Sequence, residues 1–154
     1  MTDQEHLDDW PGVDEATEVI RAYGRDSKLK PQDAQRHFDY GVAFMELGTG
    51  LEGHAIGAFK AAARLWPSWS AAHSQLGIAY ASANKREEAV ESYKQALRLK
   101  PGDTDTLAAL AHATLLLGRF NESEQAALRM VEAAPIDSGP HFVLGHGAAS
   151  TRPI

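Results

Sequence analysis

The architecture of this chain is decided by residues 70–103, which read SAAHSQLGIAYASANKREEAVESYKQALRLKPGD. In the first half of this stretch, apolar and small residues recur at helical spacing, with Leu76 and Tyr80 on one face. In the second half, Ala89 and Tyr93 begin an answering stripe, while charged residues occupy the opposite face. The stretch therefore predicts two amphipathic helices that pack against each other.

Prolines divide the chain at a constant interval. Pro67, Pro101 and Pro135 are separated by 34 residues each. Because the residue before a proline is pushed out of the α region, each proline is expected to end a helix. A fixed period of this length is typical of stacked helix pairs, so we expect a repeat architecture.

The middle stretch resembles the tetratricopeptide repeat, with His73 where that family usually has tryptophan. The residues that carry the resemblance are Leu76, Gly77, Tyr80, Ala89, Tyr93, Ala96 and Pro101. The resemblance implies an all-α fold, a right-handed superhelical solenoid of three helix–turn–helix repeats with an N-terminal helix and a C-terminal capping helix. In such a repeat, the glycine lets the two helices approach closely.

The repeat pattern can be followed along most of the chain. The predicted TPR domain, 34–149, follows a leading amphipathic helix that we place at about 13–25. In chain order, the predicted units are a mobile acidic N-terminus (1–12), the leading helix and its linker (13–33), repeats at 34–69, 70–103 and 104–137, a capping half-repeat (138–149) and a tail (150–154).

The third repeat departs from the pattern, because Ala111 replaces the glycine and Ala127 replaces the second aromatic residue. These substitutions remove volume from the interface between the two helices. We expect Leu115, Phe120 and Met130 to fill the space that is lost.

Composition excludes several functional classes. The 154 residues contain 15 lysines and arginines against 21 aspartates and glutamates, for a formal net charge of −6. This acidity argues against general affinity for nucleic acid or anionic membranes. Zero cysteines exclude thiol catalysis, disulfides and cysteine-ligated zinc. The acidic start does not resemble a secretory signal, and no apolar run approaches the roughly 20 residues of a membrane span, so we expect a cytoplasmic protein.

No motif in the sequence supports an enzyme or a cofactor site. Gly48–Gly53 matches G-x-G-x-x-G by letter, but a dinucleotide site needs a preceding strand inside a βαβ unit, and no strand pattern is present. His37, His73 and His141 share one repeat position and are explained by helix packing. No helix carries two histidines at the i, i+4 spacing of a metal site, and no nucleophile elbow appears. We therefore predict no catalytic residues, no metal and no cofactor.

The family resemblance implies instead a binding groove, because the first helix of each repeat lines the concave side. Carried onto this sequence, the groove positions are Phe38, Val42, Met45, Glu46, Ser74, Ile78, Ser82, Asp105, Ala108, His112, Leu115, Phe142 and His146. Many of these residues are more apolar than an idle surface needs. The alternative is that some of them, Leu115 and Leu116 especially, fill space left by the small residues of the third repeat.

The same positions define the kind of partner. Family members that hold the acidic tails of chaperones use lysine, asparagine and arginine, whereas this chain has Phe38, Val42, Ser74, Ile78 and Asp105 at clamp positions. The resemblance therefore argues against an acidic tail. We predict a non-enzymatic interaction module that binds an apolar peptide or helix of a partner protein, with a basic flank for Glu46 and Asp105.

Two features leave other interpretations open. Trp66 and Trp69 flank Pro67; Trp69 is expected to pack between repeats, and Trp66 is either covered or exposed as an anchor for a partner. The small residues that end the half-repeat, Gly147 and Ala148 among them, make a flat cap. The alternative function is therefore a structural module that self-associates or stacks through its open solenoid ends.

Overall fold

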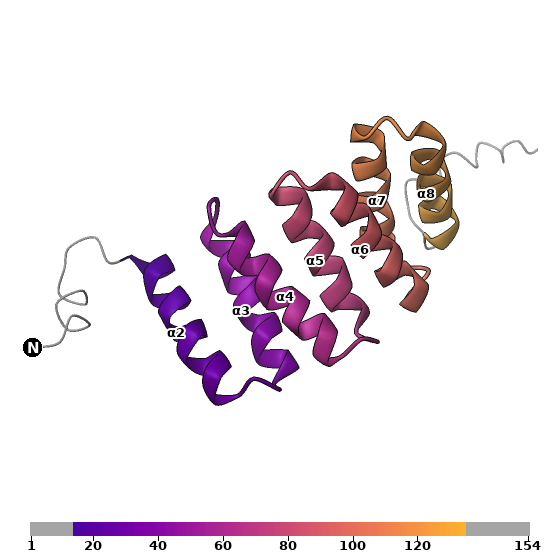
Figure 1. The fold of residues 1–154 in the computed structure, drawn as a ribbon. Helices are drawn as coiled ribbons and strands as arrows, with labels where there is room; N and C mark the ends of the chain where they lie inside the picture. The colour runs from indigo at the N-terminus through magenta and orange to yellow at the C-terminus, as the bar shows by residue number, and fades with distance from the viewer. Residues whose placement is uncertain (1–13, 135–154) are drawn as a thin grey trace, which may run out of the picture.

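The computed structural model describes residues 14–134, and within that range the chain is entirely helical. Successive helices run antiparallel and follow one another along one direction, so the array is an elongated solenoid (Figure 1). The helices are α2 (Glu15–Leu29), α3 (Ala34–Leu47), α4 (Glu52–Leu65), α5 (Ser70–Ser82), α6 (Arg86–Leu99), α7 (Thr104–Leu116) and α8 (Phe120–Ala133). The predicted all-α solenoid is confirmed for this part of the chain; the predicted capping helix at 138–149 lies outside the described residues.

The helices pair as the 34-residue period predicts. Helices α3 and α4, α5 and α6, and α7 and α8 form three helical hairpins, and each hairpin packs on the next through α4–α5 and α6–α7. We call α3, α5 and α7 the inner helices and α4, α6 and α8 the outer helices. The core lies between these two layers, with Phe44, Phe59 and Leu107 fully buried in it.

Two glycines bring the helices of the first two hairpins together. A Cβ placed on Gly41 would lie 2.5 Å from Cε1 of Phe59, and one placed on Gly77 would lie 2.5 Å from Cε1 of Tyr93. Because neither position has room for a methyl group, each aromatic ring packs directly on the backbone of the inner helix. This contact explains why the repeat pairs glycine with an aromatic residue.

The third hairpin closes without this contact, and our prediction of how it does so is partly wrong. Leu115 and Phe120 are 50% and 67% exposed, so neither fills the space left by Ala111 and Ala127. Met130 does pack against the core cluster, as predicted. Ala111 and Leu117 pack against the same cluster, so the third hairpin is closed by aliphatic side chains without an aromatic ring on glycine.

The histidines of the first two repeats act as hydrogen-bond donors at the repeat junctions. Nε2 of His37 lies 3.1 Å from the carbonyl oxygen of Pro31, and Nε2 of His73 lies 2.9 Å from that of Pro67. Since a carbonyl oxygen only accepts, both histidines carry a proton on Nε2. This position therefore fixes the turns before α3 and α5 in addition to filling space.

The leading helix α2 is longer than predicted, running from Glu15 to Leu29, and it packs on α3. Its apolar stripe ends near Tyr23, but the polar residues that follow continue the helix until Lys30, which precedes Pro31 and leaves the α region. The Tyr23 hydroxyl donates to Nδ1 of His37 at 2.8 Å, and the Tyr40 hydroxyl donates to Asp26 at 2.7 Å. These contacts attach α2 to the first repeat.

Candidate interaction surface

The inner helices form one continuous surface. Helix α3 contacts α5 and α5 contacts α7, so side chains on the same side of these three helices line a single face, which we call the inner face. All the predicted groove residues among residues 14–134 belong to these helices. Phe142 and His146 lie outside the described residues.

The predicted groove residues differ in how far they reach solvent. Ile78 is 37% exposed and Leu115 is 50% exposed, and neighbouring Leu116 is exposed as well. The structure thus contradicts the alternative in which Leu115 and Leu116 fill the third repeat. The other exposed positions are Glu46, Ser82, Asp105, Ala108 and His112, and the half-buried positions are Phe38, Val42, Met45 and Ser74.

The half-buried apolar residues of α3 have a structural role besides any binding role. Val42 and Met45 pack against the cluster that contains Phe44 and Phe59. Both side chains nevertheless remain partly exposed. The inner face is therefore partly core in the first repeat and more open at Ile78 and Leu115.

An aromatic row connects the inner face to the edge of the array. The Phe38 ring contacts Phe59 edge-on at 5.5 Å and stacks on Trp69 at 4.5 Å, with 28° between the ring planes. Trp69 in turn contacts Trp66 at 4.8 Å, and Trp66 is 49% exposed. Trp69 packs between repeats as predicted. Trp66 is half exposed, so its ring is available for contact with a partner. Sequence spacing could not reveal that Phe38 and Trp69 stack.

Ser74 links two inner helices rather than pointing freely from the face. The Thr106 hydroxyl donates to Asp103 at 2.7 Å, so its oxygen accepts from the Ser74 hydroxyl at 2.8 Å. Thr106 is buried, and Asp103 is the N-cap residue that directly precedes α7. This chain of hydrogen bonds holds α5 against α7 and stiffens the middle of the inner face.

The inner helices carry acids and little positive charge. Their acidic residues are Asp39, Glu46 and Asp105, and their one basic residue is Arg36. Arg36 is turned toward α2, within 3.5 Å of Asp26 and 3.4 Å of Asp33. Asp39 was not among the predicted groove residues. Its position in the first helix of a repeat, together with its charge, could have identified it from the sequence.

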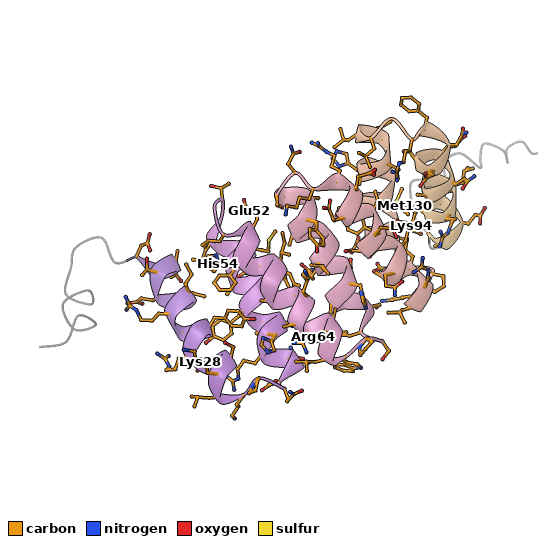
Figure 2. The ribbon with its side chains drawn as sticks, in the orientation of Figure 1. Lys28, Glu52, His54, Arg64, Lys94 and Met130 are labelled. Atoms are coloured by element: carbon orange, nitrogen blue, oxygen red, sulfur yellow. The ribbon has the colours of Figure 1, made fainter. Side chains whose placement is uncertain are left out.

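Every other lysine and arginine within residues 14–134 lies on α2, on an outer helix or in a turn. Lys28, Arg64 and Lys94, for example, lie on α2, α4 and α6 (Figure 2). The outer helices carry six of these cations but also seven acidic residues, so the two layers differ little in net charge, while the inner helices hold a single lysine or arginine.

A surface hollow of about 450 Å³ lies at the first-repeat end of the array. Its lining includes Gln35, Asp39 and Ala43 of α3, and the Gln35 amide donates to the Asp39 carboxylate at 2.9 Å. A hollow with an exposed carboxylate can accept hydrogen bonds from a donor on a partner. Arg36 also lines this hollow, so its polar surface carries both signs of charge.

The described residues contain no group of three or more histidine or acidic side chains that could hold a metal ion. The glycine-rich stretch after α3 is a turn, in which Gly48 and Gly50 have φ of 107° and 96° and the Gly50 N–H donates to Glu52. Such φ values favour glycine, so the conformation of the turn is sufficient to explain Gly48 and Gly50. No helix between residues 14 and 134 combines the length and apolarity required to cross a bilayer.

Comparison with known families agrees with this geometry. The family model described as the tetratricopeptide repeat matches residues 70–103, which form the α5–α6 hairpin. Residues 70–103 therefore match a tetratricopeptide repeat. The hairpins on either side of α5–α6 have the same arrangement, although their sequences depart further from the family pattern.

Tetratricopeptide repeat proteins are also found among its relatives. The peroxisomal targeting signal receptor of Kluyveromyces lactis is 26% identical over 139 residues, covering 84% of this chain and 24% of the receptor. The small glutamine-rich tetratricopeptide repeat-containing protein 2 of Mycosarcoma maydis is 31% identical over 85 residues, covering 55% of this chain and 24% of that protein. The chain thus spans about a quarter of the length of these relatives.

Solved structures show the same fold at low identity. A MamA double mutant aligns with a TM-score of 0.69 at 16% identity, covering 77% of this chain and 66% of that one. The second TPR of Spaghetti (RPAP3), bound to the HSP90 peptide SRMEEVD, aligns with a TM-score of 0.63 at 22% identity, covering 71% and 99%. These likenesses show the fold, and the tetratricopeptide repeat at 70–103 supports a protein–protein interaction module.

Proposed function

We propose that the array is a non-enzymatic module that binds a peptide or helix of a partner protein along the inner face. The observation that carries the proposal is the run of solvent-reaching apolar side chains through three repeats, from Phe38 and Val42 through Ile78 to Leu115. An apolar segment laid across these residues removes apolar surface of both partners from water, at about 25 cal/mol per Å². Ile78 lies on the central inner helix and is the expected anchor.

The surface is suited to binding without rearrangement. The Ser74–Thr106 hydrogen bond and the direct contacts between inner helices hold the three repeats in one arrangement. A preformed surface loses little conformational entropy when its partner arrives, so more of the contact energy appears as affinity.

The charges on the inner helices indicate which residues should flank the apolar segment of the partner. Asp39, Glu46 and Asp105 lie on the inner helices, whereas Arg36 is engaged by Asp26 and Asp33. A basic residue beside the apolar segment is therefore attracted, and an acidic tail meets like charge. Two similar proteins are named for recognising protein segments, namely a receptor for a targeting signal and a repeat bound to SRMEEVD. The second peptide carries three acidic residues, so we expect the ligand of this chain to differ from it.

The proposal can be tested with peptides selected from a random library displayed on phage. We expect the enriched peptides to combine apolar and basic residues. Ile78→Glu should weaken their binding by about tenfold or more, since it buries an unpaired charge under the ligand. Leu99→Glu is the matched control, because Leu99 is similarly exposed, at 42%, but lies at the end of outer helix α6.

Two results would contradict the proposal. One is a set of enriched peptides that binds wild type, Ile78→Glu and Leu99→Glu equally. The other is measurable preference for SRMEEVD over the selected peptides, which would require a cationic surface that the inner helices do not offer.

A further inference from the structure

Three turns on one edge of the array follow helices that end in a similar sequence. Because successive helices are antiparallel, the ends of α2, α4 and α6 lie along the same edge, the lower edge in Figure 1. We call the three residues before the proline of each turn a tip; the tips are 28–30 (Lys-Leu-Lys), 64–66 (Arg-Leu-Trp) and 98–100 (Arg-Leu-Lys). Figure 2 shows Lys28 and Arg64 near this edge and Glu52 near the opposite one.

Each tip exposes a large apolar side chain. Leu29 is 71% exposed, Trp66 is 49% exposed and Leu99 is 42% exposed. The helix dipole favours lysine or arginine in the last turn of a helix, so it accounts for the cations of the tips. It does not account for the leucines and the tryptophan, which leave apolar surface in contact with water. Exposed apolar side chains that gather on one edge among polar residues indicate an interaction surface.

The lysines and arginines of the tips are not paired with acids of the array. Within residues 14–134, no carboxylate lies within 4.0 Å of the charged nitrogen atoms of these five side chains. The acids within four residues of a tip have other partners: Asp26 and Asp33 lie 3.5 Å and 3.4 Å from Arg36, and Asp103 accepts from the Thr106 hydroxyl at 2.7 Å. The tips therefore present positive charge to solvent.

The middle tip adjoins a hollow with both cationic and apolar lining. This hollow has a volume of about 410 Å³ and is lined by Lys60 and Arg64 of α4 and by Leu76 of α5. Among the described residues that line it, none is acidic. Lys60 and Arg64 are four residues apart on one helix, so both side chains reach the same region of surface. A second hollow of the same volume adjoins Arg98, but its lining includes Glu122, so the middle tip is the more positive.

We propose that the three tips bind an extended acidic segment of a partner protein, whose carboxylates meet the lysines and arginines and whose apolar side chains cover Leu29, Trp66 and Leu99. A carboxylate beside a lysine or arginine forms a charge-assisted hydrogen bond, which is stronger than one between neutral groups. The apolar contacts distinguish such a segment from other polyanions. This surface is separate from the inner face and selects a ligand of opposite charge, so the inference does not rest on the function proposed above.

The distance between helices sets the spacing of the groups on the ligand. Neighbouring tips are two helices apart, and packed helices lie about 8–10 Å from each other, so the tips are separated by at most about 20 Å. An extended chain rises about 3.3 Å per residue, so a pair of acidic and apolar residues should recur within about six residues. SRMEEVD has seven residues and is too short to reach all three tips. The corresponding residues at the end of α8 are Glu132, Ala133 and Ala134, so the surface ends at α6.

A synthetic peptide of about fifteen residues, in which a glutamate–leucine pair recurs about every six residues, tests the proposal on the full chain. We expect the fluorescence anisotropy of the labelled peptide to show binding to wild type, and a peptide with glutamine in place of glutamate to bind about tenfold more weakly. Arg64→Glu should weaken the binding of the acidic peptide by about tenfold as well. Lys85→Glu is the matched control, because it makes the same charge change on an exposed lysine in the turn before α6, at the opposite edge.

The apolar part of the surface has its own variant. Leu29→Ser combined with Leu99→Ser should weaken binding several-fold and leave the melting temperature nearly unchanged, since both leucines are exposed. Ile78→Glu should leave the affinity for this peptide unchanged, so a failure at this edge and a failure of the inner face give different results.

Three results would overturn the proposal. Equal losses for Arg64→Glu and Lys85→Glu would mean that net charge alone determines the binding. Full affinity in the double leucine variant would mean that the exposed leucines do not contact the ligand. The third result is that the acidic peptide does not bind; if phosphatidylserine vesicles then bound wild type but not Arg64→Glu, the edge would be assigned to a lipid surface instead.

Discussion

The backbone of α5 at Gly77 packs directly on the ring of Tyr93 in α6, because a Cβ at residue 77 would lie only 2.5 Å from Cε1 of that ring. The same relationship joins Gly41 to Phe59 in the preceding hairpin. These contacts set the distance between the inner and outer helices, and hence the position of the inner face. The spacing of the helices therefore depends on a residue that has no side chain.

Gly77→Ala should destabilise the protein by about 2 kcal/mol, because the added methyl group meets a buried ring that has no free space to move into. Gly57→Ala is the control, since nothing lies within 4 Å of a Cβ at that position in α4. In a helix interior, alanine should there stabilise by about 0.5–1 kcal/mol. Urea unfolding of both variants measures the difference. Similar changes for both would show that the Gly77–Tyr93 contact does not limit the helix spacing.

The third hairpin allows a test of the pairing rule itself. Ala127→Tyr should destabilise by about 1–3 kcal/mol, because Ala111 occupies the place where the ring would pack. Adding Ala111→Gly should recover part of that loss, although Ala111→Gly alone is unfavourable in a helix. A double-mutant cycle measured by chemical denaturation gives the coupling. Strictly additive effects would mean that the two positions do not form a glycine–aromatic pair.

Burial raises the pKa of Tyr93 to about 12 from its ordinary value of 10.0. Since the folded state holds this proton more tightly than the unfolded state, its contribution to stability is complete below pH 10 and is lost as the pH rises through 12. The contribution is at most about 2–3 kcal/mol. Tyr93→Phe should therefore lose less stability than wild type between pH 10 and 12. Parallel pH profiles of the two proteins would contradict a buried, protonated Tyr93.

Helix α2 should be the least firmly held of the described helices, since it packs on α3 alone and, unlike the others, contains no buried residue. Tyr23→Phe removes the hydrogen bond to His37, at a cost of about 1 kcal/mol. Amide exchange in residues 15–29 should then accelerate about fivefold, while the amides of α5 and α6 are unchanged. Equal acceleration in all helices would show that α2 unfolds together with the whole array.

The architecture could be predicted from sequence because the 34-residue proline interval and the helical spacing of apolar residues repeat along the chain. These signals are local and survive in the third repeat, where Ala111 and Ala127 depart from the pattern. The end of α2 was missed because the apolar stripe stops at Tyr23, whereas the helix ends only where Pro31 restricts Lys30. Apolar spacing measures the packed face of a helix rather than its length.

The candidate surface was less predictable, because exposure depends on neighbours that are distant in sequence. Phe38 is half-buried because Trp69, 31 residues later, stacks on it. Leu115 holds the same repeat position as Met45, which packs against a core cluster, yet Leu115 is 50% exposed. A repeat position therefore identifies the helix face on which a residue lies, but not the fraction of its side chain that a partner can contact.

The most direct test of the central claim is to map a selected peptide onto the protein by NMR. In a titration of the ¹⁵N-labelled full chain, the amide shifts should concentrate on α3, α5 and α7, with Ile78 and Leu115 among the most affected. The corresponding shifts in Ile78→Glu should be much smaller at equal peptide concentration. Shifts concentrated on α4, α6 and α8 would contradict the account, because they would place the binding surface on the outer helices.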